Sequence, residues 1–258
     1  MEDSAGKSIL ENVNARDRLI VALDLPTVRE AKELVLSLSG LVSFFKLGLE
    51  LQFDAGRPFI EWLRNRGCRV FLDLKFFDVE ETVRRAVAQV ANIGANFLTV
   101  HGNKSIIKAA LEGRGKSDLK ILAVTVLTNM NSEDMDDFGM ACSVSDLVSR
   151  RANMAMALGC DGVIASGMEV EAILKQAKAC PKTKAPFLLV VPGIRLRNSE
   201  THEHKRSVTP GYAISAGADY LVVGRPIRDA ENKSTAAKLI LEEMQTVFDT
   251  RWQSRSVS

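Results

Sequence analysis

Long apolar runs are missing from this chain of 258 residues. No stretch reaches the roughly 18 apolar residues of a membrane-spanning helix, and segment 1–14 lacks the apolar core of a secretory signal. The four cysteines show no CxxC spacing, so disulfide and zinc frameworks are not expected and a reducing cytoplasm is the expected location. A net charge of +2 gives no field that favours nucleic acid or a membrane as partner.

Short apolar segments alternate with helical patterns along the chain. Several of these segments are almost wholly apolar, as parallel strands buried on both faces are. The predicted strands are Leu19–Asp24, Ser43–Leu47, Arg69–Asp73, Phe97–His101, Ile121–Val126, Gly162–Ala165, Phe187–Val191 and Tyr220–Gly224. The predicted helices are Thr27–Leu38, Glu81–Ile93, Val144–Leu158, Glu169–Ala179 and Thr235–Phe248, with Thr27 as a possible N-cap.

Eight strand–helix units predict an α/β fold, a single-domain (β/α)₈ TIM barrel, and a length near 250 residues is typical of that fold. A doubly wound open sheet is the alternative. We expect a disordered N-terminal tail over 1–15, the barrel over 16–250 and a C-terminal tail over 251–258.

Charged residues end the third predicted strand, where Asp73, Lys75 and Asp78 follow an apolar run. Alternate strand residues share a face, so Asp73 and Lys75 are expected to point into the barrel together. Buried charges are costly unless they are paired, and a lysine that hands over a proton is a reason to accept that cost. An ion pair that only locks the strand is the alternative.

Two further charges end the first two predicted strands. Lys46 would add to the network of Asp73, Lys75 and Asp78, and such preorganised charges can drive catalysis. Asp24 can accept hydrogen bonds from a sugar hydroxyl, or it can cap the following helix. A metal site is not expected, because the two lysines would repel a cation and no ligand spacing is present.

Glycines and an arginine follow the last two predicted strands. Gly193, Gly224 and Arg225 lie where barrels commonly bind phosphate, and a guanidinium gives phosphate two parallel donors. A surface arginine that happens to follow a glycine is the alternative. The polar stretch Arg195–Arg206 is longer than most βα loops, which favours a lid or binding loop.

Seven motifs together carry a resemblance to one family. They are Ala22-Leu-Asp24, Phe45-Lys46-Leu-Gly48, Phe71-Leu-Asp73-Leu-Lys75-Phe-Phe-Asp78, Val126-Leu-Thr128, Pro192-Gly-Ile-Arg195, Lys205-Arg206-Ser-Val-Thr209-Pro210 and Ala216-Gly-Ala-Asp219-Tyr-Leu-Val-Val-Gly224-Arg225-Pro226-Ile227. In this order, from about Arg18 to about Glu243, they resemble the orotidine 5′-phosphate decarboxylases. Metal-dependent siblings share the DxKxxD pattern but carry an acidic residue where this chain has Lys46.

The resemblance implies conversion of orotidine 5′-monophosphate to UMP and CO₂, the last step of pyrimidine synthesis, without metal or organic cofactor. It makes Lys75 the proton donor to C6 and places Asp73 against the departing carboxylate, with Lys46 and Asp78 completing the network. Substrate contacts are implied for Asp24 and Lys46 at the ribose, Thr128 and Asn129 at the base, and Pro192, Arg195, His204, Gly224 and Arg225 around the phosphate and lid.

The resemblance also implies a homodimer in which Asp78 and Thr82 reach the neighbouring site. The chain departs from the usual pattern at Asn129, where a serine is common, and at His204, where a glutamine bridges base and phosphate. Phe77, Glu80 and Glu81 also depart from it. The alternatives are a related phosphosugar decarboxylase or aldolase on the same barrel, and a non-catalytic nucleotide-binding relative.

Overall fold

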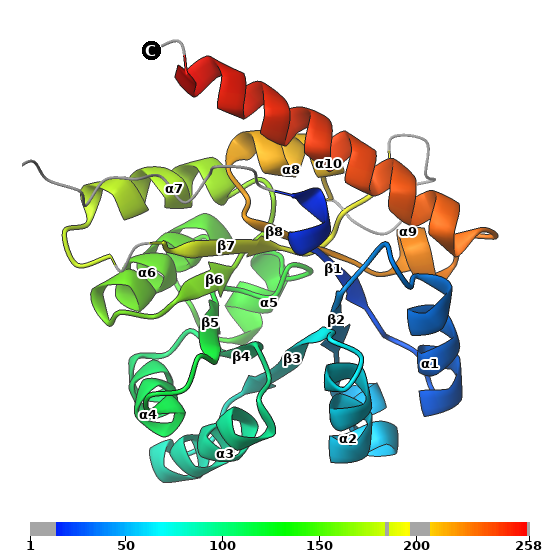
Figure 1. Ribbon diagram of the computed structural model, residues 1–258. Helices are drawn as coiled ribbons and strands as arrows, with labels where there is room; N and C mark the ends of the chain where they lie inside the picture. Colours follow the sequence, from blue (N-terminus) through cyan, green and yellow to red (C-terminus); the bar gives the residue numbers. More distant parts are fainter. Residues whose placement is uncertain (1–13, 184–185, 197–206, 257–258) are drawn as a thin grey trace, which may run out of the picture.

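Eight parallel strands close into a barrel in the computed structural model, which describes residues 14–183, 186–196 and 207–256 (Figure 1). Each strand pairs with the next, and β8 pairs with β1, so the sheet has no free edge. The predicted (β/α)₈ barrel is confirmed and the open sheet is excluded. The strands are β1 (Leu19–Ala22), β2 (Phe44–Leu47), β3 (Arg69–Phe76), β4 (Phe97–His101), β5 (Lys120–Val124), β6 (Gly162–Ile164), β7 (Leu188–Val191) and β8 (Tyr220–Val223).

Helices surround the barrel, and the last of them packs along α8 and α9 (Figure 1). Thr27 caps the first helix as predicted, because its side chain accepts a hydrogen bond from the Glu30 N–H. No helix in the described part of the chain is long and apolar enough to cross a membrane. The helices are α1 (Val28–Ser37), α2 (Leu49–Arg64), α3 (Glu80–Ile93), α4 (Lys104–Arg114), α5 (Ser132–Asp137), α6 (Val144–Ala157), α7 (Val170–Ala179), α8 (Pro210–Ala216), α9 (Arg225–Arg228) and α10 (Lys233–Ser256).

Helical structure reaches into both of the predicted tails. A 3₁₀ turn, Ala15–Asp17, begins inside the expected N-terminal tail, and Ala15 is buried there. Helix α10 continues to Ser256 and so runs through most of the expected C-terminal tail. Its sequence contains no glycine or proline that would end a helix before that point. Residues 1–13 of the N-terminal tail lie outside the described part.

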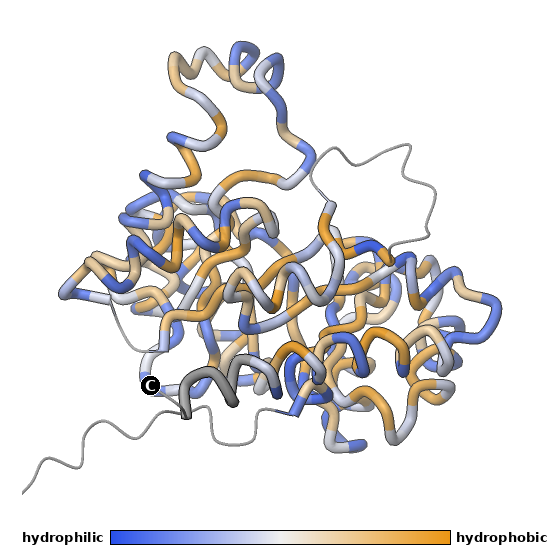
Figure 2. Tube along the Cα trace, turned by 90° about the horizontal axis from the view of Figure 1, so that it is seen from above, coloured by the Kyte–Doolittle hydropathy of each residue, from blue (hydrophilic) through white to orange (hydrophobic). Residues whose placement is uncertain are grey.

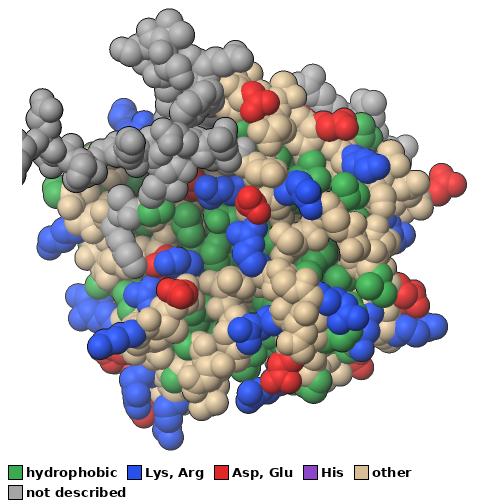
Figure 3. All heavy atoms as spheres, viewed as in Figure 1, with side chains coloured by type: hydrophobic (Ala, Val, Ile, Leu, Met, Phe, Trp, Pro, Cys, Tyr) green, Lys and Arg blue, Asp and Glu red, His purple; other side chains and the backbone are tan. Residues whose placement is uncertain are grey.

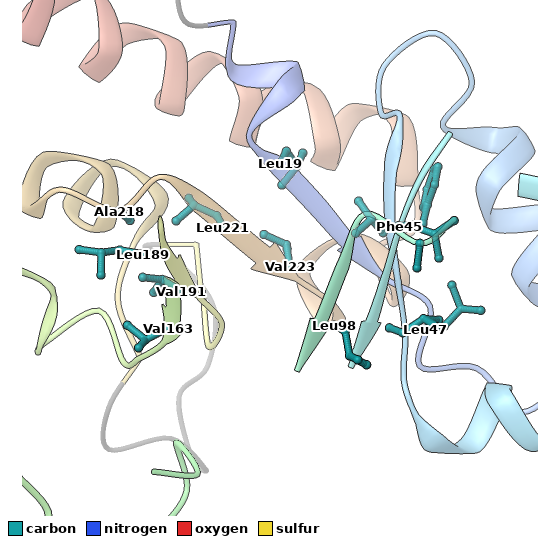
Figure 4. Packing of buried hydrophobic residues seen from close by; sticks show 14 of the residues in the cluster. Leu19, Phe45, Leu47, Leu98, Val163, Leu189, Val191, Ala218, Leu221 and Val223 are labelled. Atoms are coloured by element: carbon teal, nitrogen blue, oxygen red, sulfur yellow. The ribbon is translucent and has the colours of Figure 1, made fainter. Parts of the chain in front are cut away.

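The alternation of strand side chains divides the apolar residues into two clusters. One cluster fills the space between the strands and the surrounding helices, and Figure 4 shows part of it, with Leu19, Phe45, Leu98 and Leu221 each contributed by a different strand. Figure 2 colours each residue by its hydropathy. The hydrophobic segments run through the body of the molecule, and the hydrophilic ones gather at its periphery. Burial of this cluster holds the helices against the barrel.

The second cluster lies inside the barrel near the amino ends of the strands. It includes Phe44 and Phe97, and their rings contact Tyr220 with centroids 6.1 and 5.1 Å away. Because β2 and β4 are not neighbours of β8 in the sheet, these contacts cross the barrel interior. Arg18 lies over the Tyr220 ring and Arg69 over the Phe44 ring, which adds two cation–π contacts at this end of the barrel.

Polar side chains take the next inward positions along the strands. In β1 to β4, the apolar residues of the second cluster point into the barrel. Because strand side chains alternate between faces, the residue two positions later also points inward. At that level lie Asp24, just past the end of β1, and Lys46, Asp73 and Thr99 on the next three strands. The carboxyl end of the barrel therefore holds a charged layer above an aromatic one.

Candidate active site

The Asp73 carboxylate is the centre of the charged layer. Its Oδ1 accepts hydrogen bonds from Lys75 Nζ and from Thr99 Oγ1, each at 2.9 Å. Its other oxygen, Oδ2, lies 3.6 Å from Lys46 Nζ. The two lysines thus lie next to different oxygens of one carboxylate. Such fixed charges form a preorganised electrostatic site.

Lys46 is buried, with 7% of its surface exposed, and its charge is balanced locally. Its Nζ donates a 2.8 Å hydrogen bond to Asp24 Oδ1, at the carboxyl end of β1. Gly48 leaves room for this pair, because a Cβ there would lie 3.3 Å from Asp24 Oδ1, closer than an ordinary contact. A Cβ on Gly224 would lie 3.7 Å from Asp24 Oδ2, which is an ordinary contact.

Strand β3 is irregular at the site, and this irregularity was not predicted. Its pairing with β4 shifts register between Leu72 and Phe76. Within that stretch Lys75 has a φ of 47°, and it is the only non-glycine residue in the described ranges with positive φ. Lys75 and Asp73 do meet, as predicted, but through a left-handed turn of the backbone rather than the simple alternation of a regular strand. Such strained conformations persist where the surroundings hold them.

The Asp73 carboxyl stays ionised despite its burial. Burial alone would raise its pKa, but the charges of Lys46 and Lys75 act in the opposite direction, and the pKa falls below its usual value. Hydrogen bonds from Lys75 and Thr99 add to that lowering. A lowered folded-state pKa stabilises the protein above the unfolded pKa of about 3.9, and this contribution is lost as pH falls through the folded value.

An aromatic pair borders the network at the ends of β3 and β4. The rings of Phe77 and His101 lie 4.7 Å apart and tilted by 35°. Burial lowers the pKa of His101, and the positive charges of Arg151 and Lys75 lower it further. A neutral imidazole therefore stands beside the site at neutral pH.

The predicted phosphate-binding residues lie beside the charged layer. Gly224 precedes the short helix α9, and Arg225 is the first residue of that helix, with an exposed side chain. The distance from Gly224 to Asp24 places this turn next to the end of β1. Arg228 was not among the predicted site residues. It donates a 2.7 Å hydrogen bond to the Asp24 carbonyl and so links α9 to the end of β1.

The loop after β7 is described only at its two ends. Pro192 and Arg195 follow the strand, and both are half-buried. Ile194 pairs with Val208 in an isolated bridge, and the Arg195 N–H donates to the Val208 carbonyl at 3.0 Å. The two ends of the predicted lid therefore lie side by side. His204 falls outside the described residues.

The remaining predicted residues lie around the rim of the barrel. Thr128 and Asn129 follow β5, the first half-buried and the second exposed. Asp78 and Thr82 are exposed, and Asp78 Oδ1 accepts a 2.7 Å hydrogen bond from the Val79 N–H. The contacts that join Asp24, Lys46, Asp73 and Lys75 into one network do not include Asp78 within this part of the chain.

Other site types have little support among the described residues. No group of three or more His, Cys, Asp or Glu side chains there could hold a metal ion. On the face seen in Figure 3, Lys and Arg side chains are scattered among acidic and neutral ones and form no continuous basic patch. The charged layer inside the barrel is therefore the candidate active site.

Known proteins are similar to this chain over most of its length. The model of the orotidine 5′-phosphate decarboxylase / HUMPS family matches residues 17–240. The chain belongs to this family. An orotidine 5′-phosphate decarboxylase from Nitrobacter winogradskyi is 50% identical over 230 residues, which are 89% of this chain and 93% of that protein. One from Methylococcus capsulatus is 48% identical over 235 residues, 90% of this chain and 93% of that protein.

Solved structures agree with the family assignment. The crystal structure of orotidine 5′-phosphate decarboxylase from Lactobacillus acidophilus matches with a TM-score of 0.75 at 33% identity, covering 88% of this chain and 98% of that chain. Membership of the orotidine 5′-phosphate decarboxylase / HUMPS family confirms the resemblance that the seven sequence motifs indicated. Proteins of one fold and family can catalyse different reactions. The residues of the site are therefore needed, beside family membership, to assign the reaction.

Proposed function

We propose that Lys75 is the proton donor in this chain's reaction, the decarboxylation of orotidine 5′-monophosphate to UMP and CO₂ in pyrimidine biosynthesis. The bond between C6 and the carboxylate breaks, CO₂ leaves, and the electron pair remains on C6. The Lys75 ammonium transfers a proton to that carbon and is reprotonated from water. Substrate and one proton are thus converted to UMP and CO₂.

The observation that carries the proposal is the paired charge network in the barrel. Lys75 Nζ is held 2.9 Å from Asp73 Oδ1, and the lowered pKa of Asp73 keeps that carboxylate charged. The Asp73 carboxylate is a fixed partner for the Lys75 ammonium and holds it in position to donate a proton. Asp73 lies against the departing carboxylate, so loss of that group as neutral CO₂ relieves a repulsion between like charges.

The substrate extends from this network toward the end of β8. Asp24 and Lys46 bind the ribose hydroxyls, and their 2.8 Å pairing supports this assignment because it orients both groups in advance. The phosphate lies at Gly224 and Arg225, with Arg195 and His204 near it. The base meets Thr128 and Asn129, and Pro192 lies nearer the phosphate.

The proposed active form is a homodimer in which Asp78 and Thr82 complete the neighbouring subunit's site. The support is the exposure around them: Phe77 and Val79, on either side of Asp78, are 63% and 69% exposed. Large apolar side chains that flank a functional carboxylate are suited to an interface between protein chains. The proposed location is the cytoplasm.

A phosphosugar enzyme of the same family is the second candidate. Lys46 argues against the metal-dependent form of that chemistry, because its ammonium lies 2.8 Å from Asp24 and 3.6 Å from Asp73. A divalent cation bound by those carboxylates would meet the ammonium at close range and be repelled.

The purified chain should consume orotidine 5′-monophosphate at the same rate with and without EDTA, because fixed protein charges replace a metal. Loss of the substrate's ultraviolet absorbance, with UMP identified as product, measures the reaction. Activity that EDTA abolishes and magnesium restores would favour the phosphosugar candidate. Binding of UMP without any turnover would favour the non-catalytic relative.

A heterodimer of two inactive subunits should regain activity if the sites are shared. One subunit carries Lys75→Ala and the other Asp78→Asn, each with its own affinity tag, and two purification steps isolate the mixed form. One site then carries both defects and the other carries neither, so the expected activity is about half that of wild type for a symmetric dimer. Each variant homodimer is the control.

Recovery depends on Asp78 acting across the interface. If Asp78 served its own chain, each site of the heterodimer would carry one defect and no activity would return. Failure to isolate any species that carries both tags would contradict the dimer itself.

A further inference from the structure

Thr99 lies at the inward position of β4 that corresponds to the charged residues of the three preceding strands. It is fully buried, with 0% of its surface exposed, although a hydroxyl buried in a barrel is costly unless it is hydrogen-bonded. Neither the motifs nor the family resemblance singled it out. Its hydroxyl makes two hydrogen bonds, both with residues of β3.

The hydroxyl of Thr99 joins the backbone and the side chains of the candidate active site. Its oxygen accepts a 3.0 Å hydrogen bond from the Lys75 backbone N–H. The hydroxyl also donates a 2.9 Å hydrogen bond to Asp73 Oδ1, the same oxygen that accepts a hydrogen bond from Lys75 Nζ. A hydroxyl can donate once and accept at the same time, so both bonds are compatible.

These two bonds fall where β3 departs from regular structure. Lys75 has positive φ, and the β3–β4 register shifts around it. Left-handed backbone is unfavourable for a residue with a Cβ, so the surroundings must hold Lys75 in place. The bond from the Lys75 N–H to Thr99 is such a restraint, and it acts on the residue whose Nζ must reach the substrate.

We infer that Thr99 is a positioning residue, which fixes the left-handed backbone of Lys75 and the orientation of the Asp73 carboxylate for proton transfer. The inference rests on the proposed function of Lys75. Thr99 itself does not touch the substrate. Its removal should therefore slow the chemical step and leave the affinity for a nucleotide almost unchanged, because the groups proposed to bind ribose and phosphate lie on other strands.

The test compares Thr99→Ala with Thr99→Ser. Both variants lose the methyl group, and only serine keeps the hydroxyl. Thr99→Ala should lower kcat by roughly 10- to 100-fold, the range expected when a catalytic group is displaced. Thr99→Ser should recover most of that loss. KM for orotidine 5′-monophosphate and the Kd for UMP should change by less than about 3-fold in both, since uniform binding is retained.

Thr125→Val is the matched control for loss of a buried hydroxyl. Thr125 follows β5, is 0% exposed, and donates a 2.9 Å hydrogen bond to the Ile164 carbonyl, away from the Lys75 backbone. This variant should lower the melting temperature without lowering kcat. A purely structural Thr99 would behave in the same way.

The outcomes separate this inference from the function on which it rests. A wild-type chain without decarboxylase activity would refute both. An active wild type in which Thr99→Ala and Thr99→Ser have equal kcat would refute the role of Thr99 alone. A fall in kcat as large in Thr125→Val as in Thr99→Ala would also refute it.

Discussion

Lys75→Ala should abolish turnover while the chain still folds and still binds UMP. The variant loses the proposed proton donor, and loss of acid–base catalysis typically costs about 10²- to 10⁴-fold in rate. Asp73 would keep the hydrogen bond from Thr99 and the approach of Lys46 at 3.6 Å, so its charge would not be left without partners. We therefore expect a large fall in kcat with little change in the affinity for UMP.

The measurement is single-turnover decay of orotidine 5′-monophosphate absorbance, with circular dichroism to show that the variant is folded. Lys108→Ala, which removes an exposed lysine from α4, is the control for loss of a positive charge elsewhere. Wild-type turnover in Lys75→Ala would show that this lysine is only a structural partner of Asp73.

Arg225→Ala should lower kcat/KM for orotidine 5′-monophosphate by roughly 10²-fold, since hydrogen bonds to charged groups contribute about 1.5–3 kcal/mol. Arg225 starts α9 immediately after Gly224, where two parallel guanidinium donors suit a phosphate. Both kcat and KM should change, because binding energy from a remote group can be used to order the reacting centre.

Orotidine, which lacks the phosphate, distinguishes this role from a general loss of stability. The wild type should process orotidine poorly, and Arg225→Ala should process it equally poorly, because neither has the phosphate contact. Arg57→Ala, on the exposed side of α2, is the control for loss of an arginine. Equal kinetics of wild type and Arg225→Ala on the phosphorylated substrate would place the phosphate elsewhere.

Much of the barrel could be predicted because its strands are short, apolar and buried on both faces. All eight predicted strands exist, with ends that differ by a few residues. The helices were harder to predict from the sequence. Helix α2 contains Gly56, with non-helical backbone, and Pro58, both of which interrupt its pattern. Helices α5, α8 and α9 are only one or two turns long, too short for a periodic signal.

The contact of Asp73 with Lys46 and Lys75 could be predicted because buried charges at strand ends are costly unless they are paired. Asp78, predicted in the same network, is exposed and does not join it among the described contacts. Thr99 could not be predicted, since threonine is an ordinary strand residue and only the tertiary structure shows where its hydroxyl points. The left-handed backbone of Lys75 could not be predicted either, because lysine has no preference for positive φ. The roles of all the candidate site residues, Asp78, Thr82 and His204 among them, stay predictions.

The aromatic cluster at the amino ends of the strands has a consequence for traffic through the enzyme. Rings from Phe44, Phe97 and Tyr220 contact one another across the interior, with Arg18 and Arg69 over them. Side chains thus fill the described interior at the amino ends of the strands, and the charged layer lies on the other side of them, toward the carboxyl ends. Substrate is therefore expected to enter, and CO₂ and UMP to leave, at the carboxyl ends of the strands. A step that opens or covers that end would control the release of CO₂ together with the release of UMP.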